Sequence, residues 1–282
     1  MRLPFEIDLK GKVAVVTGAG GILCSSMAHA LAQCGAKVAL LDLNEETAKQ
    51  KAEGIAKEGK IANGYQANVL EPESLKAAHK KILEELGPCD ILINGAGGNH
   101  PLATTDKEYF AAEDLKGDVK TFFDLEQDGV EFVFDLNFIG TLLPTQEFAK
   151  DMIGKQVCNI LNISSMNAFT PLTKIPAYSG AKAAVSNFTQ WLAVHFAKEG
   201  IRVNALAPGF FVTGQNERLL YREDGSPTER TGKILAATPM NRFGRTEELI
   251  GSMLFLLSEE AAGFITGVVL PIDGGFSAYS GV

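Results

Sequence analysis

Three side chains in the second half of the chain have the types and spacing of a proton-transfer group. Tyr178 and Lys182 stand four positions apart in a stretch predicted to be helical, which puts them on one helix face. A tyrosine hydroxyl, with a pKa of about 10, is a weak acid–base near neutrality, and a neighbouring ammonium favours its phenolate. We therefore expect Lys182 to lower the pKa of Tyr178. Ser165, in the loop before this helix, would hydrogen-bond the oxygen whose proton moves. The competing interpretation is a buried tyrosine and a surface lysine that merely share a face.

The elements that must position these residues alternate along the whole chain. Short apolar runs such as 12–18, 37–44 and 158–163 are separated by longer segments with helical periodicity. This alternation is typical of βαβ units and predicts a parallel sheet with helices on both faces. We expect about seven strands in one doubly wound α/β domain covering residues 1–282, without an internal repeat.

Two long segments interrupt the alternation. Residues 99–136 are irregular and acidic, and residues 210–244 mix proline, glycine and charge. Both follow the carboxyl end of a predicted strand, which is the edge where open α/β sheets bind ligands. Long loops in compact domains are commonly functional. The first segment is therefore a candidate pocket wall, and the second a candidate lid.

Composition and charge exclude several classes of protein. The formal charge is −8 and no run of Lys or Arg exceeds a pair, which argues against nucleic acid and anionic membrane as partners. No apolar stretch has the length of a membrane span, and the first residues lack the pattern of a signal peptide. The four cysteines and four histidines are scattered, so we expect reduced thiols, a cytoplasmic protein and no metal site.

A glycine-rich turn follows the first predicted strand and opens a helix. Residues 17–23 (TGAGGIL) would present backbone N–H groups and a helix N-terminus to a pyrophosphate. Asp42, at the end of the second strand, could accept the adenosine ribose hydroxyls of NAD and would repel the 2′-phosphate of NADP. The alternative is that Asp42 merely caps the helix that begins near Glu45. A second glycine turn, 94–97, follows the fourth strand.

Together these motifs resemble the short-chain dehydrogenase/reductase family over residues 9–277. The matching segments are TGAGG (17–21), NGAG (94–97), FDLNFIGT around Asn137, Ser165, Tyr178 with Lys182, APGFFVT (207–213) and ITGVVLPIDGG (265–275). The resemblance implies a Rossmann-type, three-layer αβα fold and an NAD(H)-dependent oxidoreductase. It departs at the glycine turn, because the family pattern T-G-x-x-x-G-x-G puts Ile22 and Cys24 on two glycine positions. Gly20 and Gly21 are expected to supply the flexibility instead.

The family resemblance also implies roles for individual residues. Tyr178 would be the acid–base, Ser165 would hold the substrate oxygen, Lys182 would bind the nicotinamide ribose, and Asn137 would anchor a water that passes protons to Lys182. The expected cofactor contacts are Gly18, Gly20, Gly21, Ile22, Leu23, Asp42, Asn68, Val69, Asn94, Gly95, Ala96, Tyr178, Lys182, Pro208, Gly209 and Phe211.

Longer stretches are similar to the members of this family that interconvert D-fructuronate and D-mannonate. They cover residues 95–101, 120–125, 134–146, 163–179 and 187–198, and the ending DGGFSAYSGV. A hexuronate carries a carboxylate, so an acidic protein must place a cation or N–H donors in the pocket. The expected substrate contacts are Asn99, His100, Ser165, Asn167, Lys174 and Phe210, with Arg218 or Arg222 as further candidates from the lid.

Several alternatives remain open at this stage. The same fold and chemistry would serve another sugar acid, a polyol, a keto-gluconate or a 3-oxoacyl thioester. A protein of another class, a non-catalytic NAD(H) sensor, would typically lack the tyrosine or the lysine. The family resemblance also implies a homodimer or homotetramer. The apolar residues of 187–197, together with Phe264, Phe276 and Tyr279, would suit subunit contacts or an ordinary core.

Overall fold

The computed structural model describes residues 7–213 and 217–281, and within them the predicted seven-stranded sheet is confirmed. All neighbouring strands are parallel, in the order β3-β2-β1-β4-β5-β6-β7. The strands are β1 (Val13–Thr17), β2 (Lys37–Asp42), β3 (Ala62–Gln66), β4 (Ile91–Asn94), β5 (Cys158–Ile163), β6 (Ile201–Pro208) and β7 (Val269–Ile272). The chain reverses its direction across the sheet between β1 and β4. Such a switch point is where open α/β sheets bind ligands.

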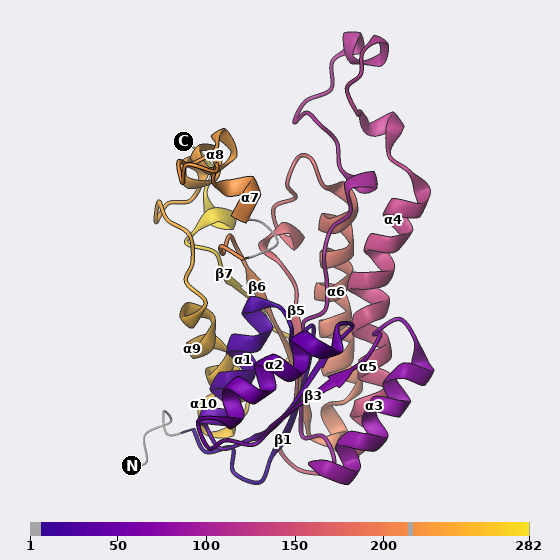
Figure 1. Ribbon diagram of the computed structural model, residues 1–282, viewed down its shortest axis with the longest axis vertical. Helices are drawn as coiled ribbons and strands as arrows, with labels where there is room; N and C mark the ends of the chain where they lie inside the picture. The colour runs from indigo at the N-terminus through magenta and orange to yellow at the C-terminus, as the bar shows by residue number, and fades with distance from the viewer. Residues whose placement is uncertain (1–6, 214–216, 282) are drawn as a thin grey trace.

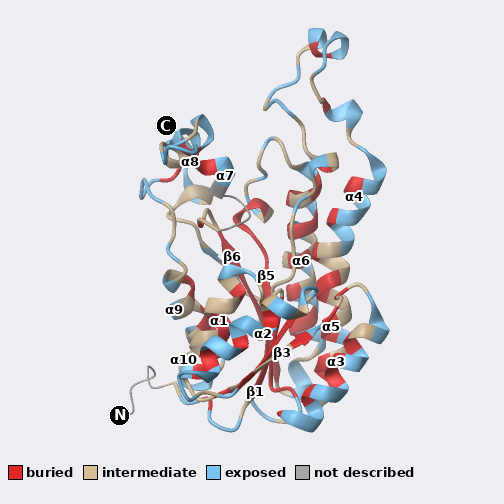
Figure 2. Ribbon diagram, viewed as in Figure 1, coloured by how far each residue is buried: buried red, intermediate tan, exposed pale blue. Residues whose placement is uncertain are grey.

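Helices cover both faces of this sheet (Figure 1). One face carries α1 (Ile22–Gln33), α2 (Glu45–Ala56) and α9 (Glu247–Leu257), and the other carries α3 (Pro72–Glu85), α5 (Gly140–Phe148) and α6 (Pro176–His195). Successive residues of β1 alternate between the two cores: Ala14 and Val16 pack with the first set of helices, and Val13 and Val15 with the second. Because both faces are covered, the central strands β1, β4, β5 and β6 are buried throughout (Figure 2), whereas the edge strands β3 and β7 are only partly buried. No helix in the described residues is long and apolar enough to span a membrane.

The segment after β4 forms an arm that projects beyond the carboxyl edge of the sheet (Figure 1). Three single-turn 3-10 helices interrupt it, at Pro101–Ala103, Ala112–Lys116 and Phe122–Asp124. The expectation that irregular chain extends to residue 136 is wrong, because α4 (Gln127–Phe134) is a regular helix that continues through a π-helical turn (Asp135–Ile139) into α5. Gly129 explains the change: α4 packs so closely on the arm that a Cβ there would lie 2.5 Å from the Leu102 side chain. We call residues 99–126 the arm.

The second long segment leaves β6 and returns close to its starting point. Phe211 forms an isolated bridge with Gly244, and a Cβ on Gly244 would lie 2.4 Å from the Phe211 ring. Between these ends lie two short helices, α7 (Glu217–Leu220) and α8 (Glu229–Ala237). Another short helix, α10 (Glu259–Ala262), follows α9. The segment is therefore a closed excursion at the carboxyl edge of the sheet.

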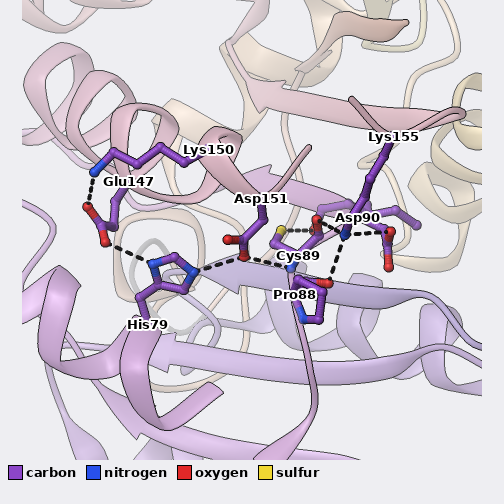
Figure 3. Close-up of polar contacts among 9 residues, drawn as sticks. His79, Pro88, Cys89, Asp90, Glu147, Lys150, Asp151 and Lys155 are labelled. Atoms are coloured by element: carbon purple, nitrogen blue, oxygen red, sulfur yellow. Dashed lines mark hydrogen bonds and ion pairs between the residues drawn. The ribbon is translucent and has the colours of Figure 1, made fainter. Parts of the chain in front are cut away.

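A buried ionic cluster joins α3 to α5 and the turn after it (Figure 3). The two ring nitrogens of His79 lie 2.8 Å from a Glu147 oxygen and 2.8 Å from an Asp151 oxygen. Asp151 also accepts a hydrogen bond from the backbone N–H of Cys89, at 2.8 Å. The cluster therefore holds α3 against α5 and against the turn that follows α5.

Candidate active site

The two glycine turns meet at the switch point between β1 and β4. Thr17 ends β1, and its buried hydroxyl accepts hydrogen bonds from the backbone N–H groups of Gly95 (3.0 Å) and Ala96 (3.2 Å). Gly18 has a φ of +66°, which favours glycine, and a Cβ there would lie 2.9 Å from the Ala96 backbone. Sequence reasoning did not assign Thr17 a role. Its place as the last residue of a buried strand, directly before the glycines, was the available signal.

The first glycine turn ends at the N-terminus of α1. Gly21 is the N-cap in an extended conformation, and no side chain caps the helix, so the first N–H groups face the sheet edge without a side-chain partner. A helix start of this kind is suited to a pyrophosphate. Gly20 is needed for space, since a Cβ there would lie 2.9 Å from the Asp42 carboxylate. Gly20 and Gly21 were expected to supply backbone flexibility, but neither has a positive φ, so neither adopts a conformation that requires glycine.

The two residues on unusual glycine positions have different surroundings. Ile22 is 41% exposed at the start of α1, whereas Cys24 is buried. A Cβ on Gly95 would lie only 2.2 Å from the Cys24 sulfur, so the thiol occupies space that a side chain at position 95 would otherwise need. Burial raises the pKa of Cys24 to about 12. The thiol is therefore a neutral packing group between the two turns.

Asp42 faces the glycine turn. Its carboxylate accepts hydrogen bonds from the backbone N–H of Gly20 (2.9 Å) and of Asn44 (3.0 Å). The cap of α2 is Asn44, whose side chain accepts from the N–H of Thr47 at 3.1 Å. The capping alternative for Asp42 is therefore wrong. Its carboxylate stands beside the turn at the carboxyl end of β2, where an adenosine ribose would lie.

The other candidate cofactor contacts near β3 and β4 differ in where their side chains point. Asn68 turns its side chain to the N–H of Leu70 (3.0 Å) and to Glu71 (2.9 Å), and buried Val69 packs toward Gly140. Asn94 points away from the edge: its amide donates to Thr145 and to Asn162, each at 2.9 Å, inside the core. Only its backbone lies at the turn.

The remaining candidates lie at the ends of α1 and β6. Leu23 is half-buried and packs against the core beneath the first turn. Pro208 ends β6, and Gly209 approaches Asp273 so closely that a Cβ would lie 2.6 Å from its backbone. Phe211 is buried behind them. The structure thus places backbone from β1, β4 and β6 along one edge.

The four residues expected to be catalytic are brought together at this edge. Ser165 follows β5, and its hydroxyl lies close enough to Tyr178 to lower the pKa of that phenol. The N–H of Asn167 donates to the Ser165 hydroxyl at 3.2 Å. Tyr178 lies in the first turn of α6, and the Lys182 nitrogen is 5.7 Å from the centre of its ring. The buried Lys182 ammonium donates to the Ile163 carbonyl at 2.8 Å.

Asn137 reaches the same place from the π-helical turn between α4 and α5. Its side chain donates to the carbonyls of Gly98 and Val133, both at 2.7 Å, and accepts from the N–H of Gly98 at 3.3 Å. Gly97 separates it from the lysine: a Cβ there would lie 2.6 Å from the Asn137 oxygen and 3.0 Å from the Lys182 nitrogen. A side chain at position 97 would fill the space that these two polar groups share.

The electrostatics of the pair differ from expectation. Burial raises the pKa of Tyr178, and the hydrogen bond with Ser165 offsets only part of that rise. Burial also lowers the pKa of Lys182, to about 8. The lysine is therefore close to losing its charge near neutral pH, and its ammonium is directed at a carbonyl rather than at the phenol. The expectation that Lys182 lowers the pKa of Tyr178 is not met, because burial has the larger effect and raises it.

The substrate candidates are more widely spread. Asn167 is 4% exposed and its side-chain oxygen has no hydrogen-bond partner, although it lies beside Ser165. Asn99 is exposed and donates to Thr104 at 2.8 Å, and His100 caps the first 3-10 turn of the arm and packs on the Phe132 ring.

The other candidates lie on the loop before α6 and on the segment after β6. Half-buried Lys174 holds the arm through its carbonyl, which accepts from the N–H of Thr105 at 2.9 Å, and Phe210 packs edge-on against Phe276. Arg218 and Arg222 are exposed, and no contact brings either side chain to the catalytic group. The arm, the loop and the segment after β6 thus border one edge, and Asn167 is the candidate that hydrogen-bonds Ser165.

The family model for short chain dehydrogenases matches residues 12–223, and the chain belongs to that family. It is an oxidoreductase that acts on CH–OH and C=O groups, and the relatives support a nicotinamide cofactor. The chain is 60% identical over 282 residues to an uncharacterized oxidoreductase of Haemophilus influenzae, with 100% of this chain and 99% of that one covered. It is 49% identical over 280 residues to the uncharacterized oxidoreductase UxuB of Bacillus subtilis, covering 99% and 100%.

Solved structures extend the comparison. One from Haemophilus influenza, described as "a putative D-Mannonate oxidoreductase" with bound NAD, superposes with a TM-score of 0.94 at 59% identity, covering 100% of both chains. A gluconate 5-dehydrogenase from Burkholderia cenocepacia, in complex with NADP and tartrate, has a TM-score of 0.81 at 29% identity and covers 98% and 99%. The gluconate 5-dehydrogenase of Gluconobacter oxydans is 34% identical over 279 residues, covering 98% and 99%. Sugar-acid dehydrogenases are thus among the relatives.

Proposed function

We propose that this enzyme interconverts D-fructuronate and D-mannonate with NAD(H). The observation that carries the chemistry is the meeting of Ser165, Tyr178, Lys182 and Asn137 around Gly97, at the switch point of the sheet. The substrate rests on the similarity to the structure described as a D-mannonate oxidoreductase. A non-catalytic sensor would have no need of the complete set of four side chains, so the enzyme is the better explanation.

The residues present fit a nicotinamide cofactor. The turn at Gly18 and Gly20 offers backbone N–H groups, Asp42 would accept the ribose hydroxyls, and Lys182 would reach the second ribose. When bound, the cofactor supplies or accepts the hydride. We propose NAD rather than NADP, because the Asp42 carboxylate would repel a 2′-phosphate.

The chain's own residues would manage the proton. In reduction, the Tyr178 hydroxyl donates its proton to the substrate carbonyl oxygen, and in oxidation the phenolate takes it back. Ser165 hydrogen-bonds the same oxygen and stabilises the charge that develops on it. A raised pKa keeps Tyr178 protonated at neutral pH, which suits the role of acid in reduction. Asn137, beside Lys182, would hold a water that returns protons to the site.

A second candidate substrate is a keto-gluconate. The gluconate 5-dehydrogenase of Gluconobacter oxydans is a relative over nearly the whole chain, and its name specifies a sugar acid as substrate. Both candidates carry a carboxylate and a secondary alcohol or ketone, so the catalytic group does not separate them. The side chains of the arm and of the loop before α6 would.

The proposal is tested by following NADH oxidation with D-fructuronate, beside D-tagaturonate, 5-ketogluconate and an NADPH control. We expect fast turnover with D-fructuronate and NADH. Replacing Tyr178 with Phe should reduce turnover by several orders of magnitude while NADH still binds. Turnover of 5-ketogluconate alone would replace the substrate and keep the chemistry. Near-normal turnover of the Phe variant would contradict the role of Tyr178.

We also propose that the enzyme works in the cytoplasm as a homodimer or homotetramer. Large apolar side chains of α6 and the tail are exposed on the single chain, among them Trp191 (55%), Val194 (80%) and Phe264 (105%). Burial of such side chains against a second copy would remove them from water. Sedimentation or light scattering of the purified protein distinguishes dimer, tetramer and monomer.

A further inference from the structure

An ion pair connects the arm to the segment after β6, across the carboxyl edge of the sheet. The Glu108 carboxylate, on the arm, lies 2.8 Å from the Lys233 ammonium on α8. Lys233 also lies 3.3 Å from Glu229, one turn earlier on the same helix. In Figure 1 the arm and α8 rise beyond the sheet from different strands. A carboxylate and a cation therefore meet between two segments that leave the carboxyl edge of the sheet.

A second cation stands close to the same carboxylate. The Thr105 N–H donates to the Lys174 carbonyl at 2.9 Å, which joins the arm to the loop before α6 only three residues from Glu108. The hydrogen bond from Lys233 and its charge lower the pKa of Glu108, and the charge of Lys174 lowers it further. Within the described residues, the Lys174 ammonium has no hydrogen bond or ion pair of its own. Lys233 thus contacts the Glu108 carboxylate, and Lys174 lies near enough for its charge to act on the same group.

The position of this group relates it to catalysis. The arm follows β4, the loop with Lys174 follows β5, and the segment with Lys233 follows β6, which are three neighbouring strands of the sheet. Lys174 precedes Tyr178 by four residues, and the same loop begins at Ser165. The two lysines therefore belong to segments that leave the same carboxyl edge of the sheet as Ser165 and Tyr178.

We infer that Lys233 and Lys174 form the site that binds the carboxylate of the substrate, and that the Glu108 carboxylate occupies this site when substrate is absent. The inference rests on the proposed function in one respect, that the substrate is a sugar acid. Glu108 presents the same chemical group that a hexuronate or aldonate would present. Its bond to Lys233 is partly exposed, with side-chain exposures of 33% and 57%, so it contributes little stability and is easily exchanged.

The inference predicts opposite changes in KM when Glu108 is replaced and when either lysine is replaced. Glu108→Gln removes a competing carboxylate, so KM for the sugar acid should fall several-fold. Lys233→Met and Lys174→Met remove cations, so KM should rise, by about tenfold for a lost charge-assisted contact. In all three variants kcat should change much less than KM. Glu229→Gln removes the other carboxylate on Lys233 without touching the arm, so KM should fall as well, but by less than in Glu108→Gln because its contact with Lys233 is longer (3.3 Å against 2.8 Å).

A purely structural clasp predicts a different pattern. If the ion pair only held the arm to α8, Glu108→Gln and Lys233→Met would both break it and would change KM in the same direction. That result would overturn the inference. A neutral ketone substrate gives a further check, because its KM should be indifferent to all three substitutions.

The failure of this inference can be told from the failure of the proposed function. Binding of sodium D-mannonate and sodium D-gluconate to the NAD-loaded enzyme is measured by calorimetry, which needs no turnover. If the wild type does not reduce D-fructuronate, the proposed substrate is rejected. Tighter sugar-acid binding by Glu108→Gln and weaker binding by Lys233→Met would still support the carboxylate site. Equal affinities in the wild type, Glu108→Gln and Lys233→Met would reject the site itself.

Discussion

Replacing Lys182 with Met should make the protein more stable at neutral pH while it abolishes turnover. Lys182 is only 3% exposed, and its ammonium has one hydrogen bond, to the Ile163 carbonyl. Burial lowers its pKa from 10.5 to about 8. A buried charge of this kind destabilises the folded protein, and methionine fills a similar volume without carrying a charge.

The magnitude follows from the pKa and from the lost hydrogen bond. One pKa unit corresponds to about 1.4 kcal/mol, so the change from 10.5 to about 8 corresponds to about 3 kcal/mol of destabilisation while Lys182 is charged. Leaving the Ile163 carbonyl without its donor costs roughly 1 kcal/mol. Lys182→Met should therefore raise the free energy of unfolding by about 2 kcal/mol at pH 7.

The pH dependence identifies the cause. Between pH 8 and pH 10.5 the unfolded chain keeps the lysine proton and the folded protein loses it, so this residue makes the wild type gain stability as pH rises. The advantage of the variant is therefore largest below pH 8 and fades by pH 10.5. Urea unfolding of cofactor-free protein, at fixed concentration and several pH values, measures it. Lys80→Met, at an exposed position of α3, is the control. A variant that is less stable at pH 7, or a difference independent of pH, would refute the reasoning.

Three further outcomes are expected. Gly95→Ala puts a Cβ 2.2 Å from the Cys24 sulfur, so NADH affinity should fall and the free energy of unfolding should drop by about 1–3 kcal/mol. Adding Cys24→Gly should restore part of the affinity and part of the stability. If it restores neither, the packing argument is wrong. Asp42→Ala should weaken NADH binding by about tenfold and narrow its preference over NADPH, as measured by fluorescence titration of both cofactors. His79→Gln breaks a buried ionic cluster and should cost about 3 kcal/mol in urea unfolding. Although burial raises the pKa of Glu147, hydrogen bonds from Lys150 and His79 hold it below 4.5. The stability that ionised Glu147 contributes is therefore present above about pH 4.5 and is lost as pH falls below it. In the His79 variant the free energy of unfolding should fall less steeply with decreasing pH in this range.

Much of the fold could be predicted from the sequence because its signals are local. Alternating apolar runs and helical periods determined the parallel sheet and its seven strands, and the structure agrees. The exception was α4, which a reading of residues 99–136 as irregular missed. Its close packing on the arm, where a Cβ at Gly129 would lie 2.5 Å from the Leu102 side chain, is a contact that no local pattern reports.

The candidate site was predictable to the extent that its chemistry follows strand ends. The glycine turn, Asp42 and the spacing of Tyr178 and Lys182 were all visible in the sequence, and the structure places them along one edge. Orientation was not visible. Asn94 belongs to a glycine turn motif, yet its side chain bonds Thr145 and Asn162 in the core. Whether a polar side chain at a strand end faces ligand or core depends on neighbours far away in the chain.

By itself the sequence predicted the fold class from residue type and spacing, and its resemblance to the short-chain dehydrogenases predicted the family; both are confirmed. The identity of the catalytic group stays a prediction. Only the tertiary structure decided how the group is charged. Burial in the assembled core raises the pKa of Tyr178 and lowers that of Lys182, the reverse of what their spacing on a helix suggested for the tyrosine. Tertiary structure also decided that Glu108 meets Lys233, 125 positions apart, across the mouth of the site. Solvation and long-range contact are properties of the folded chain, and neither can be read from one segment at a time.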